Sequence, residues 1–193
     1  MFDKIVVFDK SRFALFGICI IEPEALLLQG AMNLSVSGKA RSESSTTVVR
    51  IMMPMDANVA GNVFGGTILR LIDEVASIVA FRHARKNVVT ASIDRMDFLA
   101  PVYIGDLLRL NASINYVHRT SMEVGVRVEA ENPLTGQVRH TGTCFLTYVA
   151  LDKDRHPTPV PPIAPETEED KRRLAEAKLR RDLRLQQIGK RDA

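Results

Sequence analysis

The chain has 193 residues, of which 46% are hydrophobic and 25% charged, and its formal net charge is +3. This length predicts about one domain, and the hydrophobic fraction is that of an ordinary globular protein, which excludes a collagen-like or wholly disordered chain. A net charge this small gives no argument for nucleic-acid binding. The two cysteines, Cys19 and Cys144, belong to no Cys/His cluster, so neither a disulfide framework nor a metal site is predicted.

The N-terminal segment differs from the rest of the chain because it shows no sustained hydrophobic period and runs into a polar stretch at 37–47. We therefore expect residues 1–46 to be a poorly ordered leader. Its longest apolar stretch, 13–21, is far shorter than the about 20 residues of a membrane span. Asp3 and Asp9 also interrupt the basic start that a secretion signal needs. We therefore expect a cytoplasmic protein that does not associate with a membrane.

A long amphipathic helix is predicted over 67–83, after a short strand at 48–53 and a loop at 54–61. Its apolar residues recur at the i, i+3, i+4, i+7 spacing of one helix face. They are Ile68, Leu71, Ile72, Val75, Ala76, Val79 and Ala80.

Four strands are predicted after the helix, and they lie at 88–98, 107–117, 122–130 and 138–150. Apolar and polar residues alternate along them, and Cys144, Leu146 and Tyr148 of the last strand are expected to point inward. One-sided alternation is typical of an antiparallel sheet with one packed face. One helix and consecutive antiparallel strands predict an α+β domain in which the helix covers the sheet.

The C-terminal part begins with a Pro-rich connector at 157–165. The following segment, 166–187, starts acidic and turns basic, as the helix dipole favours, and we interpret it as a solvated helix. The predicted organisation is thus a leader at 1–46, an α+β domain at 47–155, and a connector with a C-terminal helix at 156–193.

Three features offer chemistry, and each also has a purely structural explanation. Gly65 and Gly66 directly precede the helix, whose first N–H groups can hold a carbonyl oxygen as negative charge develops, but a tight turn also needs glycine. Asp73 lies at the edge of the apolar stripe, where partial burial favours a general base, whereas a solvated carboxylate is the alternative. Asn58 can orient a water molecule or simply shape its loop. No Ser elbow or Cys–His pair is present.

Several motifs occur in order along the chain. They are P-M-D-A-N-V-A-G-N-V-F-G-G-T-I-L-R-L-I-D-E-V-A at 54–76, V-V-T-A-S-I-D-R-M-D-F-L-A-P-V at 88–102, R-T-S-M-E-V at 119–124 and P-V-P-P at 159–162. Together they resemble the hotdog-fold acyl-CoA thioesterases, in particular the cytosolic long-chain (brain-type) acyl-CoA hydrolases and their bacterial single-domain relatives. The likeness covers about residues 48–185, and the first 46 residues have no counterpart in it.

This resemblance implies a hotdog fold, in which a curved antiparallel sheet wraps one long helix, and homodimers that assemble as trimers of dimers. It implies an acyl-CoA substrate, with coenzyme A part of the substrate and no separate cofactor or metal. It also implies an active site at the dimer interface. There Asp73 is the general base or nucleophile, Asn58 of the partner subunit positions the water or the thioester, and the backbone N–H groups of Gly65 and Gly66 hold the carbonyl oxygen.

Arg119, Thr120 and Ser121 resemble family residues near coenzyme A and are expected to contact its pantetheine or phosphates. Phe64 stands where many relatives have His, which puts its acyl or pantetheine contacts in question. Two alternative functions stay open. A non-catalytic acyl-CoA-binding regulator would be expected to lose the aspartate and to add a DNA-binding segment, and a hotdog hydratase or dehydratase usually needs a His with an acid partner.

Overall fold

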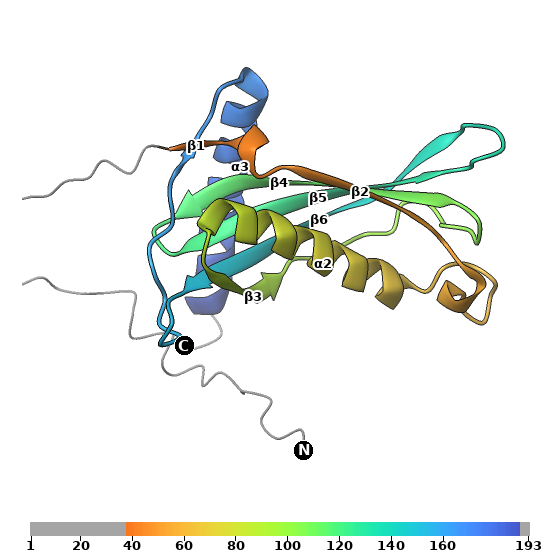
Figure 1. Cartoon of the computed structure of the whole chain (residues 1–193), viewed down its shortest axis with the longest axis horizontal. Helices are drawn as coiled ribbons and strands as arrows, with labels where there is room; N and C mark the ends of the chain where they lie inside the picture. Colours follow the sequence, from red (N-terminus) through yellow and green to blue (C-terminus); the bar gives the residue numbers. More distant parts are fainter. Residues whose placement is uncertain (1–37, 190–193) are drawn as a thin grey trace, which may run out of the picture. The chain divides into compact units, whose positions relative to one another are not determined.

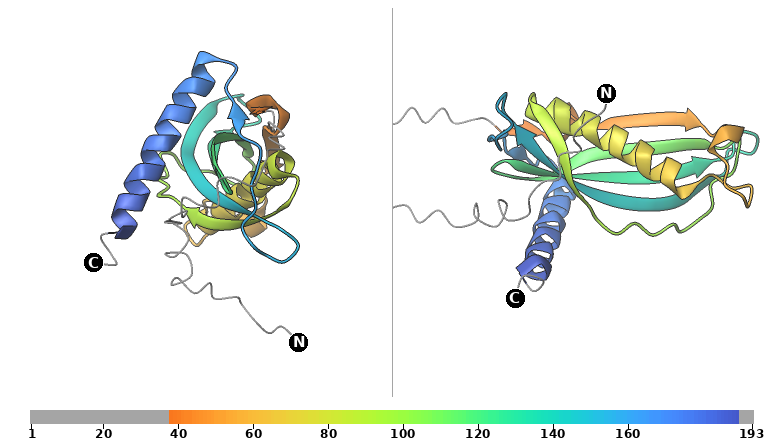
Figure 2. Two further views of the ribbon diagram at one scale, coloured as in Figure 1. Left: turned by 90° about the vertical axis from the view of Figure 1, so that its left-hand side faces the viewer. Right: turned by 90° about the horizontal axis from the view of Figure 1, so that it is seen from below.

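A five-stranded antiparallel sheet and one long helix dominate the computed structural model, which describes residues 38–189. The strands lie in the order β2 (Thr46–Ile51), β4 (Leu107–His118), β5 (Ser121–Glu131), β6 (Val138–Leu151) and β3 (Asn87–Ile93). The sheet curves around α2 (Gly65–Ala84), as Figure 1 and the end-on view in Figure 2 show. The predicted α+β hotdog architecture is confirmed.

The hydrophobic core lies between α2 and the concave face of the sheet. Alternate residues of β4, such as Leu108 and Leu110, are fully buried, and so are the predicted inward residues Cys144, Leu146 and Tyr148 of β6. Each large apolar side chain buried in this way contributes about 1.5–3 kcal/mol. The inward-facing residues of the strands, which recur every two positions, thus pack against the apolar face of the helix, whose residues follow its 3.6-residue period. Together they form a single core.

The helix α2 is slightly longer than the sequence pattern predicts, because Gly65 and Gly66 already belong to its first turn. It ends after Ala84, where Arg85 adopts the left-handed conformation with φ of 51°. The Arg85 N–H then donates to the Phe81 carbonyl at 2.8 Å, which satisfies one of the last carbonyls of the helix.

The strand expected at 88–98 is shorter in the structure, because β3 ends at Ile93. A β-bulge interrupts its pairing with β6 between Thr90 and Ser92. A bulge bends a strand and re-aims its side chains. The chain still follows β6 beyond the strand, since the Asp94 N–H donates to the Phe145 carbonyl at 2.9 Å, but it does so without regular pairing.

The N-terminal boundary of the fold lies before residue 46, which corrects the expected extent of the leader. Within the range assigned to the leader, β1 (Lys39–Ala40) pairs in parallel with β7 (Ile163–Ala164), and a 3-10 turn, η2 (Arg41–Glu43), leads into β2. Residues 38–46 are therefore part of the folded domain. The remainder of the predicted leader, including Cys19, lies outside the described residues.

The C-terminal helix α3 (Glu168–Gly189) lies on the face of the sheet opposite α2 (Figure 2). Its charged residues predicted a helix surrounded by solvent, but one side of it is covered, since Ala177 and Asp170 are buried. Between residues 38 and 189, no helix combines the length and the hydrophobicity that crossing a membrane would require.

Candidate active site

The carboxylate of Asp73 is held through one of its two oxygens. The Tyr148 hydroxyl donates to Asp73 Oδ1 at 2.7 Å, and the Thr90 hydroxyl donates to the same oxygen at 2.8 Å. Tyr148 also donates to the main-chain oxygen of Asp73 at 2.9 Å. Asp73 Oδ2 has no hydrogen-bond partner among the described residues. The arrangement fixes the carboxylate plane and leaves one oxygen free to react.

The surroundings of Asp73 differ from those of the neighbouring carboxylate. Asp73 is half-buried and Tyr148 is fully buried, while the Glu74 side chain is 52% exposed and pairs with Arg70 at 2.5 Å. Burial and the hydrogen bond to Asp73 both raise the pKa of the Tyr148 hydroxyl. The phenol therefore stays protonated and acts as a hydrogen-bond donor to Asp73.

Thr90 and Tyr148 were not among the site residues that the sequence predicted. The alternation of β6 assigns Tyr148 correctly to the buried face, but that pattern does not reveal where its hydroxyl points. Thr90 lies next to the β3 bulge, which no sequence pattern signalled. A buried Tyr usually has a hydrogen-bond partner, and this is the signal that could have directed attention to it.

The loop that carries Asn58 is fixed by the aspartate of the D-A-N motif. Asp56 is the last residue of the 3-10 turn η3 (Pro54–Asp56), and it is buried. Its carboxylate accepts hydrogen bonds from Arg50 at 3.0 Å and from the Met53 N–H at 2.9 Å. Asp56 is therefore a structural residue of this motif.

The Asn58 side chain uses its oxygen within its own loop. Oδ1 accepts from the N–H groups of Ala60 and Asn62 at 2.8 and 3.2 Å. No hydrogen bond from the Asn58 Nδ2 group is found among the described residues. The Asn58 oxygen therefore has the loop-shaping role of a turn residue. The amide nitrogen remains available to bind a group from outside the loop.

Gly65 and Gly66 form the N-terminus of α2, as their position before the helix suggested. The Phe64 ring is 57% exposed and lies over Gly66, where an added Cβ would come within 2.4 Å of it. A larger residue at position 66 would therefore require the exposed Phe64 ring to move. Among the described residues, neither glycine N–H has an acceptor, as expected at the start of a helix.

The structure does not bring all the predicted site residues together within one chain. Asp73 lies about 12 Å along the axis of α2 from Gly65, given the rise of 1.5 Å per residue. The hairpin of Arg119, Thr120 and Ser121 joins β4 to β5 at the end of the sheet opposite the Asn58 loop (Figure 1). Ser121 Oγ donates to the His118 carbonyl at 3.3 Å, and no side-chain hydrogen bond or ion pair of Arg119 is found in the described part.

The histidines offer no acid–base pair beside Asp73. His83 lies at the C-terminal end of α2, is fully buried, and has its Nε2 at 2.8 Å from the Pro161 carbonyl. Within residues 38–189, no group of three or more His, Cys, Asp or Glu side chains is arranged to hold a metal ion. The arrangement thus offers carboxylate chemistry, assisted by amide and backbone N–H groups.

Comparison with known proteins identifies the family. A family model described as the thioesterase superfamily matches residues 60–137. An uncharacterized acyl-CoA thioester hydrolase of Bacillus subtilis is 43% identical over 128 residues, which are 66% of this chain and 74% of that protein. The cytosolic acyl coenzyme A thioester hydrolase of Rattus norvegicus is 37% identical over 141 residues, which are 72% of this chain and 37% of that longer protein.

Solved structures agree with this assignment. A hexameric acyl-CoA thioesterase superposes with a TM-score of 0.76 at 42% identity, over 79% of this chain and 97% of that one. An acyl-CoA hydrolase from Staphylococcus aureus, in complex with butyryl coenzyme A and coenzyme A, has a TM-score of 0.73 at 36% identity, over 81% of this chain and 93% of that one.

Variants of the Staphylococcus aureus enzyme have also been solved, with alanine in place of an asparagine, an aspartate or a threonine. These three positions are 15 and 17 residues apart, which is also the spacing of Asn58, Asp73 and Thr90 in this chain. The extent of these matches, together with the fold and the carboxylate site, shows that the chain belongs to the hotdog-fold acyl-CoA thioester hydrolases of the thioesterase superfamily.

Proposed function

We propose that this protein hydrolyses fatty acyl-CoA to a free fatty acid and coenzyme A, with Asp73 as the reacting carboxylate. The observation that carries the proposal is the fixed Asp73 side chain, whose Oδ1 accepts from Tyr148 and Thr90 while Oδ2 has no hydrogen-bond partner within residues 38–189. The spacing shared with the substituted positions of the Staphylococcus aureus hydrolase supports the choice of Asn58, Asp73 and Thr90.

In one route Asp73 acts as a general base. Oδ2 takes a proton from a water molecule, whose oxygen attacks the thioester carbonyl carbon. The backbone N–H groups of Gly65 and Gly66 stabilise the negative charge that develops on the carbonyl oxygen. The tetrahedral intermediate then expels the coenzyme A thiolate, which takes up the proton from Asp73, so that acid and thiol are the products.

In the other route Asp73 acts as a nucleophile. Oδ2 attacks the carbonyl carbon and the thiolate leaves, which forms a mixed anhydride between Asp73 and the acyl group. Water then hydrolyses the anhydride and regenerates the carboxylate. Both routes use the same free oxygen, and Asn58 positions the water in the first or the thioester in the second.

The separation of the site residues along one chain supports a shared active site. Asn58 and Asp73 lie on different segments, and no hydrogen bond joins them in the described chain, so we infer that Asn58 of the partner subunit completes each site. The edge strand β3 and the neighbouring face of α2 expose Ile93, Ile78 and Phe81, which are 48%, 39% and 45% accessible. Exposed apolar residues on an edge strand and the helix that contacts it fit a homodimer, and the hexameric relative supports assembly as a trimer of dimers.

In this assembly the Arg119 hairpin would contact the coenzyme A part of the substrate, because a guanidinium group suits phosphate. A cytoplasmic location agrees with the cytosolic relative of Rattus norvegicus.

A thiol-release assay on the purified full chain, with palmitoyl-CoA and acetyl-CoA as substrates, tests the proposed activity. We expect coenzyme A to be released with each turnover and free acid to appear in equal amount. A sample that is folded and oligomeric but inert toward a full series of acyl chain lengths would instead favour a non-catalytic acyl-CoA-binding protein.

A further inference from the structure

The buried carboxylates of the domain are all paired with arginines. Within residues 38–189, four carboxylate side chains are buried, and each forms an ion pair. They are Asp56, Asp106, Glu123 and Asp170, whose respective partners are Arg50, Arg139, Arg180 and Arg41. A charge is costly to remove from water, so a buried carboxylate depends strongly on its partner. These four pairs therefore mark places where the fold is held by a specific contact.

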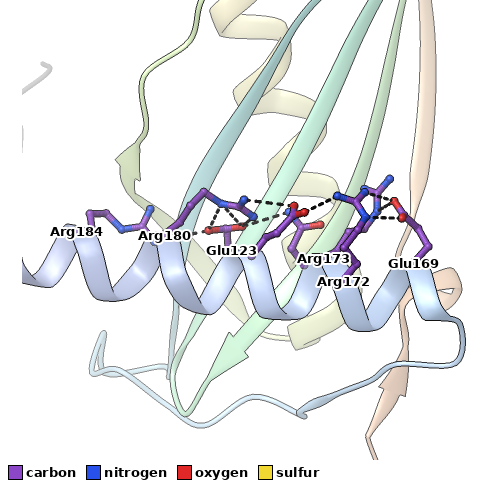
Figure 3. Close-up of polar contacts among 8 residues, drawn as sticks. Glu123, Glu169, Arg172, Arg173, Arg180 and Arg184 are labelled. Atoms are coloured by element: carbon purple, nitrogen blue, oxygen red, sulfur yellow. Dashed lines mark hydrogen bonds and ion pairs between the residues drawn. The ribbon is translucent and has the colours of Figure 1, made fainter.

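Two of the pairs hold α3 on the sheet. Figure 3 shows Arg180 of α3 directed at Glu123 of β5, with which it forms a hydrogen bond of 2.7 Å. The same guanidinium group lies 3.7 Å from the centre of the Phe145 ring. Asp170, which is also on α3, pairs with Arg41 of η2. Both pairs thus serve the docking of the C-terminal helix.

The other two pairs belong to the surroundings of the loop that carries Asn58. This Asn58 loop, residues 57–63, is closed by a β-bridge between Ala57 and Val63. The Asn58 N–H donates to the Asn62 carbonyl at 2.7 Å within it. The loop is therefore a small closed unit, and the position of Asn58 depends on the contacts that hold the ends of this unit.

A single turn, residues 102–106, holds both ends. Before the loop, the Met52 N–H donates to the Asp106 carbonyl at 2.9 Å. At the end of the loop, the Val63 N–H donates to the Val102 carbonyl at 2.9 Å. Met52, Val63 and Val102 are all buried, so these bonds are shielded from water. A shift of the turn would consequently shift the loop.

The shape of this turn depends on the Asp106 side chain and on Arg139 of β6. Asp106 Oδ2 accepts from the Tyr103 N–H at 2.8 Å and from Arg139 Nη2 at 2.5 Å. The Arg139 guanidinium also covers the Tyr103 ring, at 5.1 Å from its centre. Without Arg139, the buried carboxylate would lose its countercharge, and the turn would have to rearrange to bring it into water.

We propose that Arg139, acting through Asp106, is a positioning residue for Asn58 and therefore serves the active site of the partner subunit. This inference rests on the proposed function and its shared site, in which the Asn58 of one chain meets the Asp73 of the other. Arg139 then has no effect on the Asp73 of its own chain, although both belong to one domain. A misplacement of about 1 Å can lower a rate about a hundredfold, so a change in the turn should be measurable.

Mixed dimers separate this role from a general loss of stability. If one chain carries Asp73→Ala and the other Asn58→Ala, the single complete site takes Asn58 from the first chain and Asp73 from the second. Arg139→Gln is added to either the first or the second chain. Because both homodimers are expected to be inactive, thiol release from saturating palmitoyl-CoA reports only the mixed dimers, whose amount is measured by native mass spectrometry. We expect kcat to fall about tenfold or more with Arg139→Gln on the first chain and to change less than about twofold with it on the second.

Two further variants complete the comparison. Arg139→Lys keeps a positive charge but lacks the planar fork, so it should lower kcat less than Arg139→Gln, and again only on the first chain. It also tests the proposal if Arg139→Gln does not fold, which thermal unfolding establishes. Arg109→Gln is the matched control, because Arg109 pairs with Glu131 at 2.9 Å near the same end of the sheet, and it should have no effect on either chain.

Hydrogen exchange provides a readout that needs no substrate. The amides of the Asn58 loop should exchange at least about fivefold faster in Arg139→Gln than in the wild type, and at the wild-type rate in Arg109→Gln. Unchanged exchange in Arg139→Gln, or equal kcat for its two placements, would overturn the inference and leave the hydrolase activity standing. Mixed dimers without any activity would overturn the shared site and the inference together. A wild type that is inert toward every acyl-CoA would instead overturn the proposed function and, with it, this role of Arg139.

Discussion

The Tyr148 hydroxyl contacts both the main-chain oxygen and the carboxylate of Asp73, at 2.9 and 2.7 Å. A single buried donor therefore links the rotamer of this side chain to the backbone of α2. Since Tyr148 is anchored in β6, the carboxylate proposed to react is positioned by the core of the domain and not by a surface loop. Such rigid support is what a catalytic group needs in order to keep its geometry through each turnover.

Removal of this donor should reduce the rate of the chemical step. We expect Tyr148→Phe to lower kcat for palmitoyl-CoA about tenfold, the effect of one hydrogen bond to a charged group, while KM stays near the wild-type value. Thr90→Ser, which keeps the hydroxyl, should be much less affected than Thr90→Val. A Tyr148→Phe enzyme that retains the full kcat would show that the second donor, Thr90, suffices.

Substitution of the carboxylate itself should have the larger effect. We expect Asp73→Ala to lower turnover at least about a hundredfold, within the range of a general base. Glu74→Ala is the matched control, because Glu74 is exposed and its pair with Arg70 contributes little. Steady-state thiol release measures both variants, and equal rates for the two would contradict the assignment of Asp73.

The shared site predicts complementation between two inactive variants. Mixed dimers of Asp73→Ala and Asn58→Ala chains contain one site that has both residues and one that has neither. Random exchange in a twofold dimer should therefore restore about a quarter of the wild-type activity. Native mass spectrometry establishes that subunits have exchanged, and activity that stays at the level of the separate variants would argue against a site built from two chains.

His83 predicts how the stability depends on pH. Burial lowers the pKa of the His83 imidazole, the hydrogen bond to Pro161 offsets this in part, and Lys39 lowers it while Glu43 raises it. The unfolded chain therefore binds a proton more readily than the folded one. The neutral ring stabilises the fold fully above its ordinary pKa of about 6.5, and this contribution is lost as the pH falls through the lower folded value.

We therefore expect the Tm of the wild type to fall more between about pH 7.5 and 5 than that of His83→Gln, which lacks a titrating ring. Differential scanning calorimetry over this range gives the comparison. Parallel pH dependence of the two proteins would mean that His83 is not the group responsible.

The part of the fold that follows from residue periodicity was predictable. The alternation in β4, β5 and β6 gave both the strands and their buried faces, and the stripe from Ile68 to Ala80 gave the helix to within a few residues. The end of β3 was not predictable, because the apolar residues at 94–98 continue the pattern while the bulge after Thr90 breaks the pairing. The packing of α3 was also missed, since the alternating charges of the outer sheet face, such as Glu123, are read as solvent-exposed.

The residues proposed for the site follow from the sequence, whereas the geometry around Asp73 could not be predicted from it. Asp73 and Asn58 came from a resemblance to a family, and their own surroundings in the sequence left a solvated carboxylate and a turn residue as alternatives. The partners of Asp73 depend on how β3 and β6 pack against α2, which is a relation between residues far apart in the chain. No local pattern encodes which oxygen of a carboxylate is engaged.

Strand β6 carries Tyr148 toward α2 and Phe145 toward Arg180, on opposite faces of the sheet. Because neighbouring residues of a strand face opposite ways, inserting or deleting one residue would exchange the two sides at once. Related sequences should therefore lack insertions and deletions within this strand. The exposed turn at Leu134 and Thr135 can vary in length without this consequence.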